Sequence, residues 1–284
     1  MSIPSLKGYA LPAGNELPEN KVNWTFEPAR GALLIHDMQN YFINFWGENC
    51  PMIAQVIRNI AALRDYCHQQ AIPVYYTAQP NQQSDKDRAL LNDMWGPGLN
   101  KHPEQQKIVA ALAPQAQDEV LVKWRYSAFH RSPLEQHLKE NGRDQLIICG
   151  VYAHIGCLTT AIDAFMRDIQ PFMVADALAD FSRDEHLMAL KYTAGRAGKV
   201  VTTEELLPIP QSKEQLRALI LPLLDDGEVP SESENLIDYG LDSVRIMALA
   251  ARWRNVYHDI DFVMLAKEPT LAAWWALLAR ERKA

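Results

Sequence analysis

A short apolar strand, a glycine turn and a helix follow one another in the middle of the chain, and this unit restricts the possible folds most strongly. Gln145 to Cys149 has the composition of a buried parallel strand, Gly150 opens the turn, and a helical pattern runs from Leu158 to Ile169. In an open α/β sheet such a turn lies at the carboxyl end of a strand, where ligands bind, and the helix amino terminus behind it favours anionic groups. The unit therefore predicts an α/β fold with a binding site at this turn.

The chain up to Leu207 continues the same alternation. Strands alternating with helices imply a parallel sheet with helices on both faces, here six-stranded. Residues 1–28 are predicted to form an ordered arm over this domain, and residues 93–98 a loop that covers the site. Strands are expected at 32–35, 73–77, 119–123, 145–149, 172–175 and 199–202, and helices at 52–70, 134–139, 158–169 and 184–192.

The pattern changes at Leu207 to Ser212, where two prolines indicate a linker. Beyond it no strand is expected, and helices are predicted at 214–224, 243–254 and 272–282. The predicted organisation is an α/β domain over 1–207, a linker over 208–212 and a small all-α, four-helix domain over 213–284.

Charge and cysteine content exclude several classes of protein. A net charge of −7 over 284 residues argues against a surface for nucleic acid or anionic membranes. No apolar run approaches the roughly 20 residues that span a bilayer, and the first residues lack the features of a signal peptide. The four cysteines have no CxxC spacing, so neither a disulfide framework nor a zinc site is expected, and the chain is predicted to be cytoplasmic.

Three predicted parallel strands end in residues that carry chemistry. Asp37 follows the first, Lys123 closes the third, and the turn that holds Gly156 follows the fourth. At that sheet edge a low dielectric favours a protonated carboxyl, which suits a general acid. Taken singly, Asp37 could instead be a helix cap and Lys123 a solvated edge residue.

The glycine turn and the helix after it resemble the nucleophile turn of the isochorismatase-like cysteine hydrolases, through Gly150-Val151, Gly156 and Thr160-Ala161-x-Asp163-Ala164. By this resemblance the attacking cysteine stands where this chain has Gly156. Cys157 is the next residue along the chain, and a helical step of about 100° directs its side chain elsewhere. The segment around Asp37, Ile35 to Gln39, resembles the acid motif of the same superfamily. The scaffold is predicted to be present without its nucleophile.

Three histidines suggest a metal site, but the pattern of the superfamily's metal-binding nicotinamidases is incomplete. Where those enzymes carry a histidine after the second strand, this chain has Gln79-Pro80-Asn81-Gln82. His36, His130 and His154 are therefore interpreted as structural or capping residues, with no catalytic metal.

Across its whole length the chain resembles the bifunctional isochorismatase and aryl carrier proteins of catechol siderophore assembly. The resemblance implies that the substrate is isochorismate, a dianion with an enolpyruvyl ether. It implies that Asp37 protonates the vinyl methylene, that Lys123 holds a carboxylate and that Gly156 leaves room where relatives carry cysteine. Water addition would then give pyruvate and 2,3-dihydro-2,3-dihydroxybenzoate. The residues implied to line the pocket are Gln79, Arg88, Trp95 and Tyr152.

The segment Asp238 to Val244 resembles the 4′-phosphopantetheine attachment site of carrier proteins, with Ser243 as the attachment residue. The alternative is that Asp242 or Ser243 only caps a helix. Met247 lies one turn further, either on a partner surface or in the core. Asp225 and Asp242 belong to an acidic loop, with Asp226, Glu228, Glu232, Glu234 and Asp238, and are candidate ligands for Mg²⁺.

The resemblance also implies partners. They are a phosphopantetheinyl transferase, a 2,3-dihydroxybenzoate–AMP ligase, the condensation module of a nonribosomal peptide synthetase, and a second copy in a homodimer. Two other hypotheses remain open from the sequence. An amidohydrolase is opposed by Gly156 and the missing metal-site histidine. A scaffold with an inactive hydrolase domain is opposed by the presence of Asp37 and Lys123.

Overall fold

Six parallel strands form one sheet in the order β3-β2-β1-β4-β5-β6. The computed structural model describes residues 5–207, 210, 212–225, 229–254 and 259–281. All six predicted strands are confirmed, although β5 is longer than expected. The strands are β1 Gly31–His36, β2 Val74–Ala78, β3 Glu119–Val122, β4 Gln145–Val151, β5 Gln170–Ala179 and β6 Lys199–Val201.

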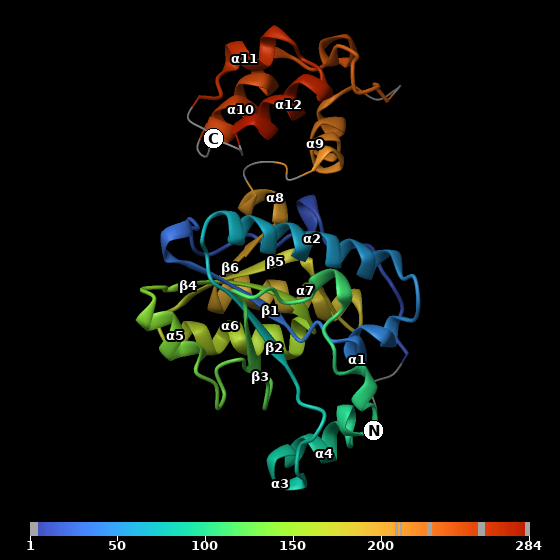
Figure 1. Ribbon diagram of the computed structural model, residues 1–284, viewed down its shortest axis with the longest axis vertical. Coiled ribbons are helices and arrows are strands. Elements are labelled where there is room, and N and C mark those ends of the chain that lie inside the picture. Colours follow the sequence, from blue (N-terminus) through green and yellow to red (C-terminus); the bar gives the residue numbers. More distant parts are fainter. Residues whose placement is uncertain (1–4, 208–209, 211, 226–228, 255–258, 282–284) are drawn as a thin grey trace. The chain divides into compact units, whose positions relative to one another are not determined.

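Helices cover both faces of the sheet because its central strands are apolar on both sides. The strand β1 is buried at every position, and so is β4. In Figure 1, α2 (Pro51–Gln69) and α8 (Thr203–Leu206) lie on one side of the sheet, and α5 (Leu134–Glu140) and α6 (Leu158–Phe165) on the other. The remaining α-helices of this part are α1 Asn40–Ile43, α3 Asp85–Arg88, α4 Leu90–Trp95 and α7 Arg183–Tyr192.

The strand order places the glycine turn at a topological switch point. From β1 the chain proceeds outward to β2 and β3, whereas from β4 it proceeds in the opposite direction to β5 and β6. The helices that leave β1 and β4 therefore diverge, and a crevice opens at the carboxyl ends of these two strands. This is where the sequence predicts the site.

Two segments near this edge differ from the prediction. The helix after β4 is preceded by a π-helical turn, Ala153–Cys157, and ends at Phe165 rather than Ile169. The expected covering loop is mostly helical, because α4 extends to Trp95 and a left-handed Gly96 ends it. Figure 1 shows α3 and α4 apart from the sheet, at the end of an excursion that follows β2.

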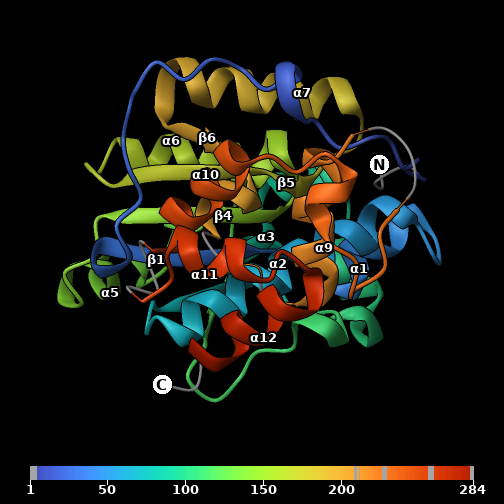
Figure 2. The same ribbon diagram turned by 90° about the horizontal axis from the view of Figure 1, so that it is seen from above.

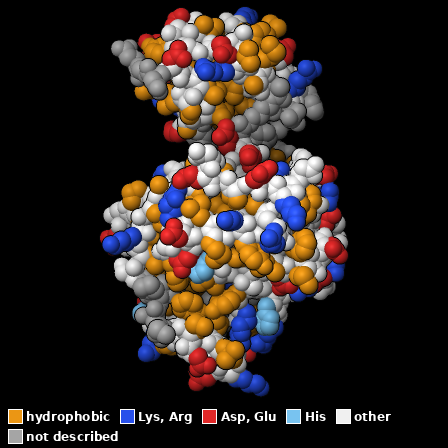
Figure 3. All heavy atoms as spheres, turned by 180° about the vertical axis from the view of Figure 1, so that it is seen from behind, with side chains coloured by type: hydrophobic (Ala, Val, Ile, Leu, Met, Phe, Trp, Pro, Cys, Tyr) orange, Lys and Arg blue, Asp and Glu red, His pale blue; other side chains and the backbone are white. Residues whose placement is uncertain are grey.

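The amino-terminal arm is ordered from residue 5 onward, as predicted. Backbone-to-backbone hydrogen bonds join it to the domain from Leu6 N to Phe45 O (2.8 Å) and from Lys21 N to Ala194 O (3.0 Å). On the face of this part that Figure 3 displays, acidic and basic side chains are interspersed. Among the described residues no helix is long and apolar enough to cross a membrane.

The chain divides into two compact units, Met1–Leu206 and Leu207–Ala284. The second is helical, and its α-helices are labelled in Figure 2. It has its own core, with Trp253 and Trp274 among the fully buried side chains. Of the predicted linker, residues 208, 209 and 211 lie outside the described residues. The α-helices of the second unit are α9 Lys213–Ile220, α10 Ser243–Arg254, α11 Phe262–Lys267 and α12 Leu271–Glu281. No range was predicted for α11.

Candidate active site

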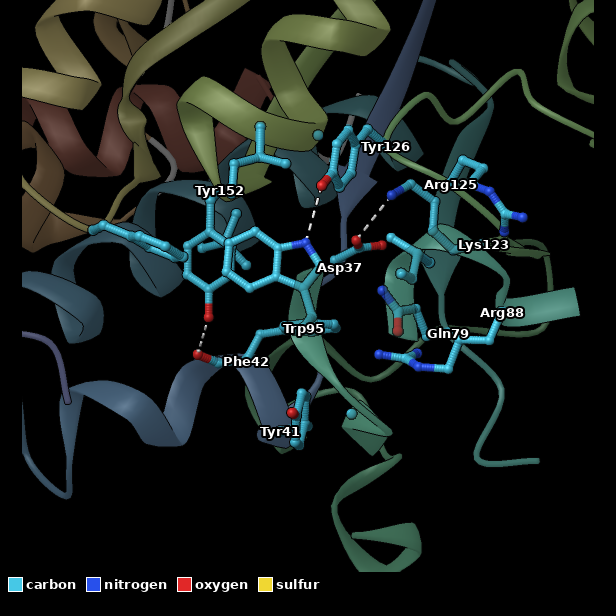
Figure 4. Close-up of a pocket in the computed structure, with 16 residues that line it drawn as sticks. Asp37, Tyr41, Phe42, Gln79, Arg88, Trp95, Lys123, Arg125, Tyr126 and Tyr152 are labelled. Atoms are coloured by element: carbon cyan, nitrogen blue, oxygen red, sulfur yellow. Dashed lines mark hydrogen bonds and ion pairs between the residues drawn. The ribbon is translucent and has the colours of Figure 1, made fainter. Parts of the chain in front are cut away.

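A cavity at the carboxyl ends of the strands brings Asp37, Lys123 and Gly156 together, as their strand-end positions predict. The four residues expected to line the pocket are also there (Figure 4). They come from three separate segments: Gln79 follows β2, Arg88 and Trp95 belong to α3 and α4, and Tyr152 follows β4.

Asp37 is fixed by two neighbouring strands. Thr77, in β2, donates a hydrogen bond to Asp37 Oδ1 (2.6 Å), and Lys123 Nζ donates to Oδ2 (3.1 Å). Both carboxyl oxygens are thus engaged, and the first helix after β1 begins only at Asn40, so Asp37 is not a helix cap. Lys123 is 3% exposed, which also excludes the solvated-edge interpretation. The pair is a buried carboxyl and ammonium at the floor of the cavity.

Arg88 brings a second positive charge to the cavity without a counter-ion. Its guanidinium is buried and donates to two neutral acceptors, Gly96 O (2.7 Å) and Gln83 Oε1 (3.2 Å). Among the described residues no carboxylate lies within ion-pair distance of it. Burial accordingly lowers the pKa of Arg88. A buried cation with unused N–H groups is suited to bind an anionic ligand.

Gly98 makes this placement of Arg88 possible. Its φ of +54° is left-handed, and a Cβ on it would stand 2.9 Å from Arg88 Cζ and 3.1 Å from Nη1. A side chain at this position would therefore displace the guanidinium from the cavity.

Aromatic rings form the wall opposite the charges. Trp95 donates from Nε1 to Tyr126 OH (2.9 Å), and Tyr152 donates from its hydroxyl to Phe42 O (2.9 Å). Phe181 packs edge-on against Tyr152, with ring centroids 4.7 Å apart. Burial raises the pKa of Tyr152 well above its ordinary value, so its phenol stays neutral. The wall is apolar and contributes no charge.

The role expected of Gly156 needs correction. Its backbone lines the cavity, but a Cβ on it would not enter open space, because the imidazole of His36 occupies that position. The missing side chain therefore makes room for His36 rather than for a ligand. Cys157 points into the hydrophobic core, is fully buried, and burial raises its pKa well above the ordinary value, so it is not a nucleophile.

His154 contacts the carboxylate of Asp180 with both its backbone N–H and its imidazole. Asp180 accepts from His154 N (2.7 Å) and pairs with Nδ1 (2.5 Å). Burial disfavours the imidazolium, but Asp180 outweighs it and raises the pKa of His154. With Glu185 these residues form the one group of possible metal ligands among the described residues. Both Asp180 oxygens already accept hydrogen bonds, which fits a structural role.

Several lining residues were not predicted, although some could have been. Arg125 and Tyr126 lie two and three residues after Lys123, and Phe181 lies shortly after β5, so strand ends signal all three. Tyr41 and Phe42 lie in α1 and carry no such signal. None of the described residues that line the cavity is a cysteine, serine or threonine.

In the second unit, Ser243 is the first residue of α10 and is exposed. Asp242 caps this helix by accepting from Arg245 N (2.8 Å), so the cap does not depend on the serine. Met247 is 54% exposed, which excludes the core interpretation. Asp225 is exposed, and its carboxyl lies where a Cβ on Gly240 would stand. Mg²⁺ binding by Asp225 and Asp242 stays a prediction, and Asp226 and Glu228 lie outside the described residues.

Comparison with known proteins connects both units to described families. Residues 31–205 match the family described as Isochorismatase domain, and residues 214–278 match the one described as Phosphopantetheine attachment site. The chain is 74% identical to enterobactin synthase component B of Escherichia coli (strain K12), over 100% of both chains. It is 46% identical to isochorismatase of Bacillus subtilis (strain 168), over 98% of this chain and 96% of that one.

The fold also resembles solved structures. A cysteine hydrolase from Pseudomonas syringae pv. phaseolicola 1448A superposes with a TM-score of 0.60 at 25% identity, covering 65% of this chain and 94% of that chain. That likeness agrees with the six-stranded parallel sheet and its flanking helices.

Proposed function

This chain belongs to the isochorismatase family and joins to it a phosphopantetheine attachment domain, and we propose that it hydrolyses isochorismate and carries the derived aryl acid. One observation carries the enzymatic part. A buried carboxyl and ammonium, Asp37 and Lys123, face a cavity that is also lined by Arg88, a cation without a carboxylate partner among the described residues. None of the described lining residues is a cysteine, serine or threonine. Such a site suits acid-catalysed hydrolysis of an anion without a covalent intermediate.

The positive charges account for substrate binding. Isochorismate is a dianion, and Arg88 and Lys123, two of the three cations among the described lining residues, can each take a carboxylate. As the anion approaches, Lys123 exchanges part of its contact with Asp37 for the substrate.

The reaction follows from a proton on Asp37. The carboxyl donates it to the vinyl methylene carbon, and the adjacent ether carbon becomes an oxocarbenium ion. Water adds to that carbon and returns a proton to the Asp37 carboxylate. The hemiketal then collapses with cleavage of the carbon–oxygen bond, giving pyruvate and 2,3-dihydro-2,3-dihydroxybenzoate. Lys123 supports the carboxylate between the two proton transfers, from 3.1 Å.

Pyruvate release from isochorismate, coupled to lactate dehydrogenase, tests this proposal. Asp37→Asn should lower the rate by about 10²–10⁴-fold, because an amide cannot deliver the proton. Cys157→Ala is the matched control and should retain the rate. Reaction in H₂¹⁸O should leave the dihydroxy product unlabelled, since water attacks the enol carbon. Near wild-type activity of Asp37→Asn, or ¹⁸O in the dihydroxy product, would contradict the mechanism.

The second unit is proposed to carry 4′-phosphopantetheine on Ser243. The support is an exposed serine that opens α10, with the cap supplied by Asp242 instead. A transferase can then reach the hydroxyl without disturbing the helix end. The arm would receive 2,3-dihydroxybenzoate from an AMP-forming ligase and pass it to a condensation module of a siderophore synthetase. A homodimer is part of the same proposal.

Intact-mass measurement decides the attachment site. Incubation with coenzyme A and a phosphopantetheinyl transferase should add one arm to the wild-type chain and none to Ser243→Ala. Pyruvate release should be equal in both. An arm on the alanine variant would place the attachment elsewhere.

A further inference from the structure

His36 lies behind the cavity wall, between the end of β1 and the turn that follows β4. Its side chain has no exposed surface, and it does not line the cavity. Its Nδ1 donates a hydrogen bond to the backbone oxygen of Val151 (2.8 Å), and Val151 is the last residue of β4. The imidazole therefore connects the end of β1, which Asp37 follows, to the end of β4, which the glycine turn follows.

Two glycines, Gly150 near the end of β4 and Gly156 in the turn that follows it, approach His36 more closely than any other residue could. A Cβ on Gly150 would stand 2.8 Å from His36 N and 3.0 Å from His36 C. A Cβ on Gly156 would stand 2.8 Å from Nε2 and 3.1 Å from Nδ1, and closer still to Cε1. Gly156 has no left-handed φ, so the imidazole, and not the backbone conformation, excludes a side chain at this position.

The ring acts by its volume and its hydrogen bond rather than by charge. Burial lowers the pKa of His36 to about 4, so the imidazole is neutral at pH 7. Its Nδ1 is 3.6 Å from Asp37 Oδ2, which has Lys123 Nζ as a closer partner, while Thr77 donates to Oδ1. His36 is thus not part of the proton-transfer machinery.

We propose that His36 is a positioning and specificity-determining residue, whose imidazole fixes the turn beside Asp37 and prevents any nucleophilic side chain at position 156. This inference rests on the proposed hydrolysis of isochorismate. A thiol or hydroxyl on Gly156 would enter the wall next to Asp37 and invite covalent chemistry. While the ring is present, residue 156 can present only its backbone to the cavity, and water remains the nucleophile.

A double-mutant cycle between Gly156→Ala and His36→Ala tests the steric part. Gly156→Ala alone should lower the melting temperature of the hydrolase unit by at least about 5 °C, as overpacking does. Adding His36→Ala should raise it again, because the introduced methyl group then occupies vacated space. Gly195→Ala is the matched control: Gly195 also lies in a π-helical turn, and a Cβ there meets nothing within 4 Å. It should leave the melting temperature unchanged.

Kinetics tests the positioning part. Gly156→Ala should lower kcat about 10²-fold, the cost of a shift of about 1 Å in a catalytic group. The double variant should have a kcat at least about tenfold higher than that of Gly156→Ala. A purely structural role of His36 would not produce this recovery of kcat. His36→Asn, which can still donate to Val151 O, should keep a higher kcat than His36→Ala at similar KM.

Thiol labelling gives a readout that needs no substrate. In Gly156→Cys/His36→Ala, iodoacetamide should modify the introduced thiol, whereas Gly156→Cys alone should be unlabelled there or fail to fold. The proposal is overturned if Gly156→Ala behaves like Gly195→Ala, or if the effects of the two substitutions simply add. If wild-type protein released no pyruvate, the proposed function would fail, while the melting-temperature cycle and the labelling would still decide the exclusion at position 156.

Discussion

Acidification should destabilise the hydrolase unit through its buried neutral histidines. His36 and His186 are both fully buried, and burial lowers the pKa of each to about 4. In the unfolded chain a histidine has a pKa of about 6.5. Below that pH the unfolded state binds protons that the folded state cannot bind until pH 4. Stability is therefore complete above pH 6.5 and is lost as the pH falls from 6.5 towards 4.

The size of the effect follows from the same values. A pH of 5 is about 1.5 units below the pKa of a histidine in the unfolded chain, and each unit corresponds to about 1.36 kcal/mol. Each buried histidine therefore lowers the free energy of unfolding at pH 5 by about 2 kcal/mol. Other groups also titrate in this range. A substitution that removes one histidine isolates its share. His186→Gln should therefore reduce the loss between pH 7.5 and pH 5 by about 2 kcal/mol.

Urea titrations of the full chain at pH 7.5, 6.5, 5.5 and 5.0 measure this difference. Amide exchange of peptides from β1 and β4 assigns the transition to the hydrolase unit. His186 Nδ1 lies 3.1 Å from Tyr9 OH, a contact that glutamine can replace in part, so the variant should fold. His130→Gln, at an exposed position, is the control and should keep the wild-type pH dependence. An identical pH dependence in His186→Gln and wild type would refute the reasoning.

Three further predictions concern the cavity and the carrier unit. Arg88→Met should raise KM for isochorismate about 10–100-fold in the pyruvate assay, the cost of one charge-assisted hydrogen bond; an unchanged KM would remove Arg88 from carboxylate binding. Met247→Ala should slow transfer of the aryl group to a condensing enzyme while arm attachment, followed by intact mass, stays normal, because Met247 is 54% exposed; loss of folding would contradict a surface role. Expressed separately, residues 1–207 should release pyruvate at nearly the full-chain rate and residues 211–284 should accept the arm, and two inactive fragments would refute the division into independent domains.

The sequence alone determined the elements and the strand ends. Apolar runs bounded by turns gave all six strands, because a strand buried on both faces needs a continuous apolar run. Since the carboxyl ends of parallel strands meet at one edge, the positions of Asp37, Lys123 and the glycine turn were enough to predict that they converge. The helix from 158 was predicted too long because the buried Ile169 continues its apolar pattern beyond Phe165. The helix α11 was missed because its six residues are too few to show a helical period.

Tertiary structure decided which side chains are buried or exposed and which distant residues they contact. The sequence placed Gly156 in the turn, but the imidazole that fills its side-chain space comes from His36, far away in the chain, and no local pattern encodes that contact. Arg88 is buried without a carboxylate partner only because Gly98 leaves room for its guanidinium. Met247 fits a core or a surface equally well in the helical pattern, and the packing of the helices left it exposed. Periodicity follows from backbone geometry within one element, whereas burial and pairing depend on which distant elements pack together.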